Sequence, residues 1–214
     1  MTQQTFEAAL SQCPLIAILR GLAPSQAREI GQSLYETGFR LIEVPLNSPQ
    51  ALESIALLRG NLPADCVIGA GTVMTPQACA EVAEAGGQII VMPHSDPAVI
   101  RAAKAAGLAC CPGVATPTEA FAALAAGADV LKMFPAEQVG VHVLKAWRAV
   151  MPASIRLVPV GGITPGNLEA FVKAGASGFG LGSALYKPGQ DGRQVGAQAR
   201  AFIQAWSQVT PAHA

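Results

Sequence analysis

The amino-acid sequence predicts an α/β protein in which residues 1–214 form a single (β/α)8 barrel with an extra N-terminal helix. Two observations lead to this fold. Short runs of apolar or β-branched residues recur along the chain, and segments with the start and stop signals of helices separate them. Nearly continuous apolar strands that alternate with helices indicate a parallel sheet buried on both faces. A doubly wound open sheet is the alternative, but eight repeating units favour the closed barrel.

Eight runs of this kind are expected to form the strands. They are LIAIL from Leu15, LIEV from Leu41, VIGAGTV from Val67, QIIVM from Gln88, LACC from Leu108, VLKMF from Val130, RLVPV from Arg156 and GFGLGS from Gly178. The runs are apolar almost throughout rather than alternately apolar and polar, which is typical of strands with helices on one side and a closed interior on the other.

The expected helices are marked at both ends. Each begins at Pro or at a capping residue and ends at Gly, which is the usual asymmetry of helix termini. The clearest ranges run from Pro24 to Gly38, Thr75 to Gly86, Pro97 to Gly107, Thr116 to Gly127 and Thr164 to Gly175. Residues 2–12 are expected to form the extra N-terminal helix.

The composition limits the classes of partner. The chain is 51% hydrophobic and 13% charged, with a formal net charge of zero. A neutral chain has no general attraction for nucleic acid or for an anionic membrane surface, so we expect neither as a partner. No apolar run approaches the roughly 18 residues that suggest a membrane span, and the N-terminus lacks the pattern of a signal peptide. We therefore expect a cytoplasmic protein.

The cysteines and histidines do not predict a metal site. Five cysteines without a CxxC pair fit neither a disulfide framework nor a zinc site, and we expect them to be reduced and mostly buried. The sequence contains no HxH or HExxH pattern. These observations disfavour a metal-dependent mechanism.

Charged residues are scarce where the chemistry of a barrel is expected. Reactive residues of such barrels lie at the C-terminal ends of the strands and in the loops that follow them. Only Arg20, Glu43 and Lys132 fall within strands or at their outgoing ends, and charges there are costly unless they are paired or functional. These three residues are therefore the candidates for an active site. The charges expected at the strand beginnings, on the opposite face, are Arg40, Asp65, Asp129 and Arg156.

Lys132 lies on an apolar strand, in VLKMFPAE. Burial beside another cation should lower its pKa and leave a neutral amine that can attack a ketone carbon. The alternative is a buried lysine that pairs with a carboxylate for stability.

Glu43 and Arg20 are expected at the same end of the barrel. Partial burial of Glu43 would raise its pKa and suit it to proton transfer; alternatively, it only neutralises Lys132 or Arg20. The planar guanidinium group of Arg20 suits a carboxylate or a phosphate. A salt bridge to Glu43 is the alternative for Arg20.

Two glycine-rich turns follow the last two strands. Gly161 and Gly162 lead into a helix expected to begin at Pro165, and Gly182 and Ser183 are expected to begin a short extra helix. Exposed N–H groups at such turns bind phosphate without a basic side chain. One glycine pair could be explained by a tight turn alone, but pairs at both places favour a phosphate site, which barrels often carry there.

A third small-residue segment, Gly69-Ala70-Gly71-Thr72, follows the third strand. Thr72 could donate a hydrogen bond to a substrate carboxylate, because the small residues let a ligand approach the backbone. A tight turn without a ligand explains this segment equally well.

These segments together resemble the 2-keto-3-deoxy-6-phosphogluconate and -phosphogalactonate aldolases. The K-x-F-P-A of the sixth strand is the most specific element, and the resemblance runs from Pro14 to about Gly189. The matching segments are PLIAILRG, GFRLIEVPLNSP, VIGAGTV, VLKMFPAE, PVGGITPGNL and GLGSALY.

The resemblance implies a class I aldolase that needs no metal or organic cofactor and assembles as a homotrimer of (β/α)8 barrels. It implies that Lys132 forms a Schiff base and that Glu43 is the acid/base. The substrate would be a phosphorylated sugar acid, and pyruvate would be one product. The implied substrate contacts are Arg20, Thr72, Gly162, Gly182 and Ser183, with Val160 and Gly161 beside them.

Two positions resemble the phosphogalactonate branch. Gluconate enzymes typically carry arginine where this chain has Asn47, and threonine where it has Val160. The two substrates differ only in the configuration at C4, and one such exchange is worth about 1–3 kcal/mol, so activity on both epimers is expected.

Two other functions are compatible with a phosphate-binding barrel. An isomerase, epimerase or synthase would use the same glycine turns without needing a lysine at a strand end beside a lone glutamate. A non-enzymatic sugar-phosphate binding protein would not need Lys132 and Glu43 at all.

Overall fold

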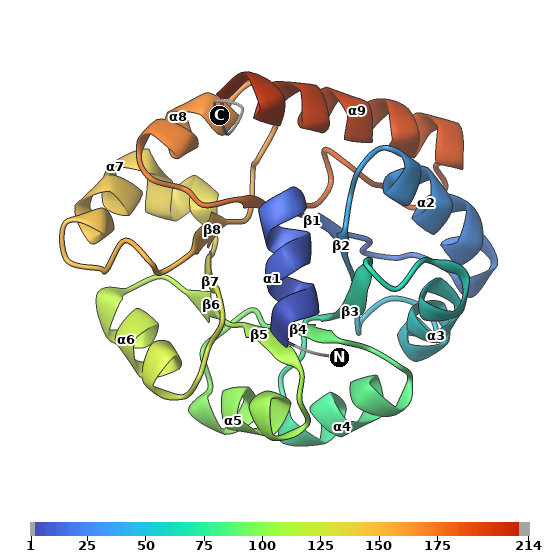
Figure 1. The fold of residues 1–214 in the computed structure, drawn as a ribbon, viewed down its shortest axis with the longest axis horizontal. Coiled ribbons are helices and arrows are strands. Elements are labelled where there is room, and N and C mark those ends of the chain that lie inside the picture. The colour runs from blue at the N-terminus through green and yellow to red at the C-terminus, as the bar shows by residue number, and fades with distance from the viewer. Residues whose placement is uncertain (1–2, 210–214) are drawn as a thin grey trace.

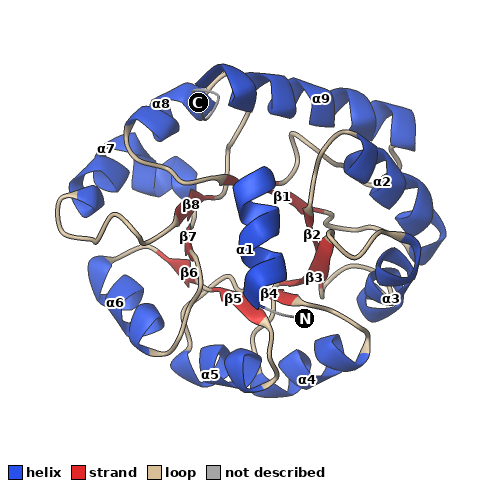
Figure 2. Cartoon of the chain, viewed as in Figure 1, coloured by secondary structure: helices blue, strands red, loops and turns tan. Residues whose placement is uncertain are grey.

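In the computed structural model, residues 3–209 are described, and residues 1–2 and 210–214 lie outside the described part. A ring of helices surrounds the strands, and α1 (Gln3–Gln12) lies across the middle of that ring (Figure 1). Figure 2 shows the same arrangement by element type, with the strands inside the ring and all helices except α1 around them. The predicted N-terminal helix is therefore present from Gln3 onward, whereas residue 2 lies outside the described residues.

Each of the eight predicted runs contains a strand. The strands are β1 (Leu15–Ile18), β2 (Leu41–Pro45), β3 (Val67–Gly71), β4 (Ile89–Val91), β5 (Ala109–Cys111), β6 (Gly113–Val114), β7 (Leu131–Met133), β8 (Leu157–Pro159) and β9 (Phe179–Leu181). The additional short strand β6 directly follows Pro112. Because proline has no N–H to donate, it interrupts the strand that begins at Ala109.

The strands pair in parallel and form a curled sheet. Six strands follow the order β5-β4-β3-β2-β1-β9, and three follow the order β6-β7-β8. A single parallel bridge between Val160 and Gly180 joins the two parts next to β8 and β9. At the other edge, Pro112 alone separates β5 from β6. The two parts are therefore neighbours at both edges.

Alternate strand residues belong to two separate clusters of apolar side chains. Leu15 and Ala17 of β1 belong to the larger cluster, together with the buried faces of the surrounding helices. Ile16 and Ile18 belong to a smaller cluster enclosed by the strands, which also contains Phe6 of α1. The period of two residues in a strand produces this division, and α1 covers one end of the inner cluster.

The predicted helices agree with the outer helices except at two places, and three outer helices, at 51–61, 136–148 and 192–209, had no predicted range. The outer helices are α2 (Pro24–Glu36), α3 (Ala51–Asn61), α4 (Pro76–Glu84), α5 (Pro97–Ala105), α6 (Pro117–Ala125), α7 (Ala136–Arg148), α8 (Leu168–Lys173) and α9 (Gly192–Val209). The first exception is α8, which begins at Leu168 rather than at Pro165. Asn167 closes a turn there instead, because its side chain accepts from Thr164 N–H at 2.9 Å and donates to the Gly162 carbonyl at 2.8 Å.

The second exception is the short extra helix expected at Gly182 and Ser183, which is wrong. The N–H groups of Leu185 and Tyr186 both donate to the Gly182 carbonyl, at 2.8 and 3.0 Å, and the helix goes no further. Pro188 follows, and a proline both lacks an N–H and disfavours helical backbone at the residue before it. The segment is therefore a single turn.

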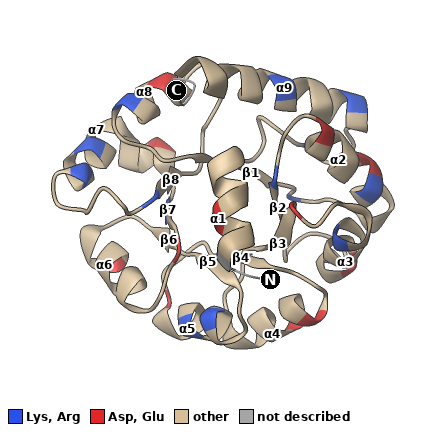
Figure 3. Cartoon of the chain, in the orientation of Figure 1, with Lys and Arg blue, Asp and Glu red and all other residues tan. Residues whose placement is uncertain are grey.

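The four charges predicted at the strand beginnings all take part in ion pairs. The pairs are Arg40–Asp65 at 3.0 Å, Lys104–Asp129 at 2.7 Å and Arg156–Glu7 at 2.5 Å. Glu7 belongs to α1, which therefore lies at the strand-beginning end of the molecule. Most other charged positions lie on the outer helices (Figure 3). The opposite end, where the strands finish, is left for the candidate site.

The expectation that the cysteines are buried and outside disulfides is confirmed. All five cysteines are buried and free. None of the helices within residues 3–209 is long and apolar enough to cross a membrane.

Candidate active site

Parallel pairing brings the three candidate charges to one end of the sheet. Ile18 of β1 pairs with Glu43 of β2, and the N–H of Leu19 donates to the Glu43 carbonyl at 2.9 Å. Arg20 therefore leaves β1 beside Glu43. Lys132 lies in the middle of β7, and its charge and that of Arg20 both lower the pKa of Glu43. The three side chains predicted from separate strands thus form one group.

Lys132 is buried and forms no ion pair with any residue in the described part of the chain. Its residue is 8% exposed, and no hydrogen bond or ion pair of its ammonium group occurs among the described residues. Nζ instead lies 4.4 Å from the centre of the Phe134 ring. Burial lowers the pKa of Lys132, Glu43 opposes this effect, and Arg20 adds to it. The expected depression of the pKa is found, whereas the structural ion pair that was its alternative is not.

Glu43 is the complementary acid. It is 2% exposed, and its Oε2 is buried without a hydrogen-bond partner. Burial raises the pKa of Glu43 to about 7, although Lys132 and Arg20 lower it. The carboxyl group packs directly against Gly71, where any Cβ would overlap it. Glycine at the end of β3 therefore makes room for this acid, which can donate or accept a proton near neutral pH.

Arg20 does not pair with Glu43 in this structure. Its side chain is exposed, and Nη1 donates to Oδ1 of Asn47 at 2.8 Å. The amide of Asn47 holds the guanidinium group at the mouth of the site and leaves its charge uncompensated. Arg20 is thus free to meet an anionic group of a ligand.

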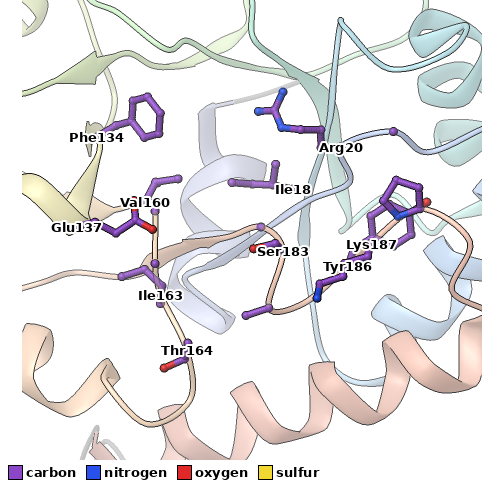
Figure 4. Close-up of a pocket in the computed structure, with 16 residues that line it drawn as sticks. Ile18, Arg20, Phe134, Glu137, Val160, Ile163, Thr164, Ser183, Tyr186 and Lys187 are labelled. Carbon is purple, nitrogen blue, oxygen red and sulfur yellow. The ribbon is translucent and has the colours of Figure 1, made fainter.

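A cavity of about 470 Å³ is lined by Arg20 and by Phe134, whose ring contacts Lys132 Nζ. Lys132 and Glu43 do not line it themselves. Figure 4 shows Val160 and Ile163 on one side of it and Ser183 and Tyr186 on another. All the predicted substrate-binding residues except Thr72 line this cavity; they are Arg20, Val160, Gly161, Gly162, Gly182 and Ser183.

The two glycine turns lie side by side at this cavity. Gly161 and Gly162 have φ angles of +108° and +63°, a backbone that side chains rarely tolerate. The bridge between Val160 and Gly180 sets the first turn next to the second. At Gly182, a Cβ would meet nothing within 4 Å, so the backbone there is open to a ligand. Such a double turn presents N–H groups that suit an anion.

Thr72 occupies a different position from the other predicted binding residues. It directly follows Gly71, which contacts the Glu43 carboxyl group, and it does not line the cavity. Its φ angle is +56°, which is strained for a β-branched residue and costs on the order of 1–3 kcal/mol. Strain of this kind is commonly retained at functional sites.

Sequence reasoning missed several cavity residues. Glu137, Lys187, Phe134 and Tyr186 all line the cavity, and the hydroxyl group of Tyr186 is buried without a hydrogen-bond partner. Phe134 and Glu137 fall within VLKMFPAE, directly after a strand end, and Lys187 follows the glycine turn after β9. Their position just beyond strand ends was the available signal. No group of three or more metal-binding side chains occurs within residues 3–209.

Comparison with known proteins gives a consistent set of relatives. The KDPG and KHG aldolase family matches residues 6–194. A probable 2-dehydro-3-deoxy-6-phosphogalactonate aldolase of Rhizobium meliloti (strain 1021) is 47% identical, over 92% of each chain. The 2-dehydro-3-deoxy-6-phosphogalactonate aldolase of Escherichia coli (strain K12) is 44% identical, over 93% of this chain and 97% of its own. A 2-dehydro-3-deoxy-phosphogluconate aldolase of Treponema pallidum (strain Nichols) is 34% identical, over 77% of this chain and 78% of its own.

Solved structures give the same grouping. A native KDPGal structure superimposes with a TM-score of 0.91 at 44% identity, covering 92% of this chain and 96% of its own. A porous protein cage designed by fusing symmetric oligomeric domains matches with a TM-score of 0.90 at 44% identity, over 92% and 73% of the two chains. A KDPG aldolase of Legionella pneumophila, with pyruvate captured as a covalent carbinolamine, matches with a TM-score of 0.80 at 26% identity, over 98% and 99%.

Proposed function

The chain belongs to the KDPG and KHG aldolase family, and we propose that it cleaves 2-dehydro-3-deoxy-6-phosphogalactonate to pyruvate and D-glyceraldehyde 3-phosphate. The enzyme would be a class I aldolase, a carbon–carbon lyase of galactonate catabolism. The observation that carries this proposal is the buried, unpaired Lys132 beside the buried acid Glu43. The relatives of higher identity are named for the galactonate substrate, which favours that epimer over the gluconate one.

The reaction begins at Lys132. Its lowered pKa increases the fraction of neutral amine, which attacks the C2 ketone of the substrate to form a carbinolamine. Glu43, with a pKa of about 7, donates a proton to the C2 hydroxyl group, which leaves as water and gives the iminium. The carbinolamine captured in the Legionella pneumophila relative supports this order of events.

Carbon–carbon cleavage then uses the same two residues. Glu43, now a carboxylate, accepts the proton of the C4 hydroxyl group through a water molecule. The C3–C4 bond breaks, its electrons move into the iminium, and glyceraldehyde 3-phosphate leaves. Protonation of the enamine at C3 and hydrolysis of the new iminium release pyruvate and free Lys132. The iminium serves as the electron sink, a role that a Lewis-acidic metal ion plays in other aldolases.

The two ends of the substrate bind at different places. The phosphate lies on the backbone N–H groups of the turns at Gly161-Gly162 and Gly182-Ser183, which line the cavity. The C1 carboxylate meets Arg20 and the hydroxyl group of Thr72 near Glu43. Because the substrate spans the distance between these two anion sites, C2 is positioned at Lys132.

The epimer preference is assigned to Val160 and Asn47. Val160 lines the cavity, and Asn47 holds Arg20 at 2.8 Å rather than contributing a second arginine. An apolar wall at Val160 gives no hydrogen-bond partner to a C4 hydroxyl group on its side, whereas a threonine would.

The curled sheet has two edges at which it could close into a barrel. We propose that the two parts of the curled sheet form one eight-stranded barrel, with β5 and β6 counted as a single strand broken at Pro112. The bridge from Val160 to Gly180 supports closure at the other edge.

We also propose that the protein is a cytoplasmic homotrimer. The use of a similar chain as a symmetric oligomeric domain in a designed cage supports an oligomer. Five free buried cysteines are typical of a reducing compartment, which supports the cytoplasm.

Borohydride trapping tests the reaction class. Reduction in the presence of pyruvate should attach a three-carbon adduct to Lys132, located by peptide mass spectrometry. Absence of the adduct in folded protein with excess pyruvate would exclude the Schiff-base mechanism.

The epimer assignment is tested by comparing kcat/KM for the galacto and gluco substrates, with Val160→Thr as the second protein. The galacto substrate should be preferred by the natural chain, and Val160→Thr should shift the ratio toward the gluco substrate by about 10-fold to 200-fold. A gluco preference in the natural chain would reassign Val160 to packing alone.

A further inference from the structure

Among the described residues that line the cavity, three carry charged side chains: Arg20, Glu137 and Lys187. Arg20 is already held by Asn47, at the end where the substrate carboxylate is expected. The other two flank the glycine turns. In Figure 4, Glu137 and Lys187 lie on opposite sides of the cavity, with Ser183 between them. The mechanism described above uses neither residue.

Glu137 packs directly on the first glycine turn. A Cβ placed at Gly162 would overlap Cγ of Glu137 and lie 2.8 Å from its Oε1, and a Cβ at Gly161 would lie 3.4 Å from its Oε2. The carboxylate therefore lies over the turn whose N–H groups are expected to bind phosphate. Glu137 is exposed, and no hydrogen bond or ion pair of its carboxylate occurs among the described residues.

Lys187 supplies the opposite charge on the other wall. Its side chain is exposed, and its ammonium group takes part in none of the ion pairs found in the described part of the chain. The N–H of Lys187 donates to Oε1 of Gln190 at 2.7 Å, which fixes the backbone just after the second glycine turn. The phosphate subsite is thus bordered by one anion and one cation, neither neutralised by the protein.

We propose that Glu137 is a specificity-determining residue that weakens the binding of a phosphate group at the glycine turns, and that Lys187 on the opposite wall partly offsets this repulsion. This inference rests on the proposed function, because it places a phosphate group on the glycine turns. A phosphate ester carries a charge of about −1.5 to −2 at neutral pH, so a carboxylate against the same turn repels it. A substrate that is also held at Arg20 and Lys132 compensates for this repulsion, whereas inorganic phosphate cannot. The same repulsion favours release of the phosphorylated aldehyde once the C3–C4 bond is broken.

Calorimetric titration with inorganic phosphate tests the inference directly. We expect Glu137→Gln to bind phosphate about threefold to tenfold more tightly than the natural chain, and Lys187→Gln to bind it more weakly by a similar factor. Both differences should shrink as the salt concentration rises, because exposed charges are screened. The matched control is Glu84→Gln, which removes an exposed carboxylate of α4 away from the cavity and should leave the affinity unchanged.

The outcomes separate this inference from the proposed reaction. Equal or weaker phosphate binding by Glu137→Gln would overturn the role of Glu137, and an unchanged affinity in Lys187→Gln would overturn the role of Lys187. Pyruvate carries no phosphate, so borohydride trapping with pyruvate does not depend on the phosphate subsite. Failure of trapping in the natural chain would exclude the aldolase proposal, and the phosphate titrations would still test the role of Glu137. If phosphate binds to none of the variants, the phosphate subsite and this inference both fail.

Discussion

Charged side chains at the two ends of the strands are arranged in opposite ways. At the strand beginnings they meet partners of opposite sign, as in Lys104–Asp129 at 2.7 Å and Arg40–Asp65 at 3.0 Å. At the strand ends, Lys132 and Glu43 are more deeply buried but form no ion pair. The first arrangement compensates charge and stabilises the fold. The second buries two opposite charges without a direct ion pair, and this burial costs stability, raises the pKa of Glu43 and lowers the pKa of Lys132.

The largest expected contrast is between two lysines on opposite ends. Lys132→Met should lower kcat/KM by on the order of 10⁴-fold or more, because it removes the nucleophile, without lowering the free energy of unfolding. Lys104→Met should lower the free energy of unfolding by about 1–3 kcal/mol, because the mostly buried Asp129 loses its cation. Steady-state kinetics and urea denaturation measure both quantities. Marked destabilisation by Lys132→Met would show that the two ends do not differ in this way.

Glu43→Gln tests whether the acid at the strand ends, like Lys132, affects the reaction rather than the stability of the fold. The amide has nearly the same shape but cannot transfer protons, so kcat should fall by about 10²-fold to 10⁴-fold while the fold remains intact. Circular dichroism and kcat measurements on Glu43→Gln, with Glu84→Gln as the exposed control, provide the check. Unfolding of the Glu43 variant would mean that this carboxylate is structural.

The pH dependence of stability isolates the burial of Glu43. Its pKa is raised by burial from 4.5 to about 7, so the folded state favours the protonated acid. The contribution of this group to stability is therefore complete below pH 4.5 and is lost as the pH rises through 7. Relative to Glu43→Gln, the natural chain should lose about 3 kcal/mol between pH 4 and pH 8. The free energy of unfolding of both proteins can be measured by urea denaturation at several pH values. The same pH dependence in the two proteins between pH 4 and pH 8 would contradict the raised pKa.

The smallest effect is expected at the exposed pair of the strand-beginning end. The Asp65 side chain is 50% exposed, and its ion pair with Arg40 is accessible to water and salt. Asp65→Asn should lower the free energy of unfolding by less than about 1 kcal/mol and leave kcat/KM unchanged. A kinetic defect in this variant would show that the two ends are coupled.

Some of the structure follows directly from local sequence patterns. The eight apolar runs all contain strands, because short, nearly continuous apolar runs between glycine and proline signals are typical of buried strands. Lys132 and Glu43 could be selected without coordinates, since a charge within such a run must be paired or functional. The same argument found Arg20, whereas the two glycine turns were found from their position directly after the last two predicted strands.

Other features depended on contacts between distant segments. Arg20 pairs with Asn47 rather than with Glu43, as two exposed side chains from neighbouring loops meet there. Glu137 lies on the turn at Gly162 only because α7 begins beside the end of β8. None of these contacts has a sequence period that could reveal it.

The sequence by itself therefore determined the repeating α/β architecture and the family to which the chain belongs, and it indicated Lys132 and Glu43 as the candidate catalytic pair. These are properties of local composition and of short motifs, which the surrounding fold does not alter. Only the tertiary structure decided that Lys132 and Glu43 are buried together without an ion pair, and that Glu137 and Lys187 line the same cavity as the two glycine turns. Burial and the distances between charges arise when strands from separate parts of the chain pair, and those two quantities set the pKa of each group.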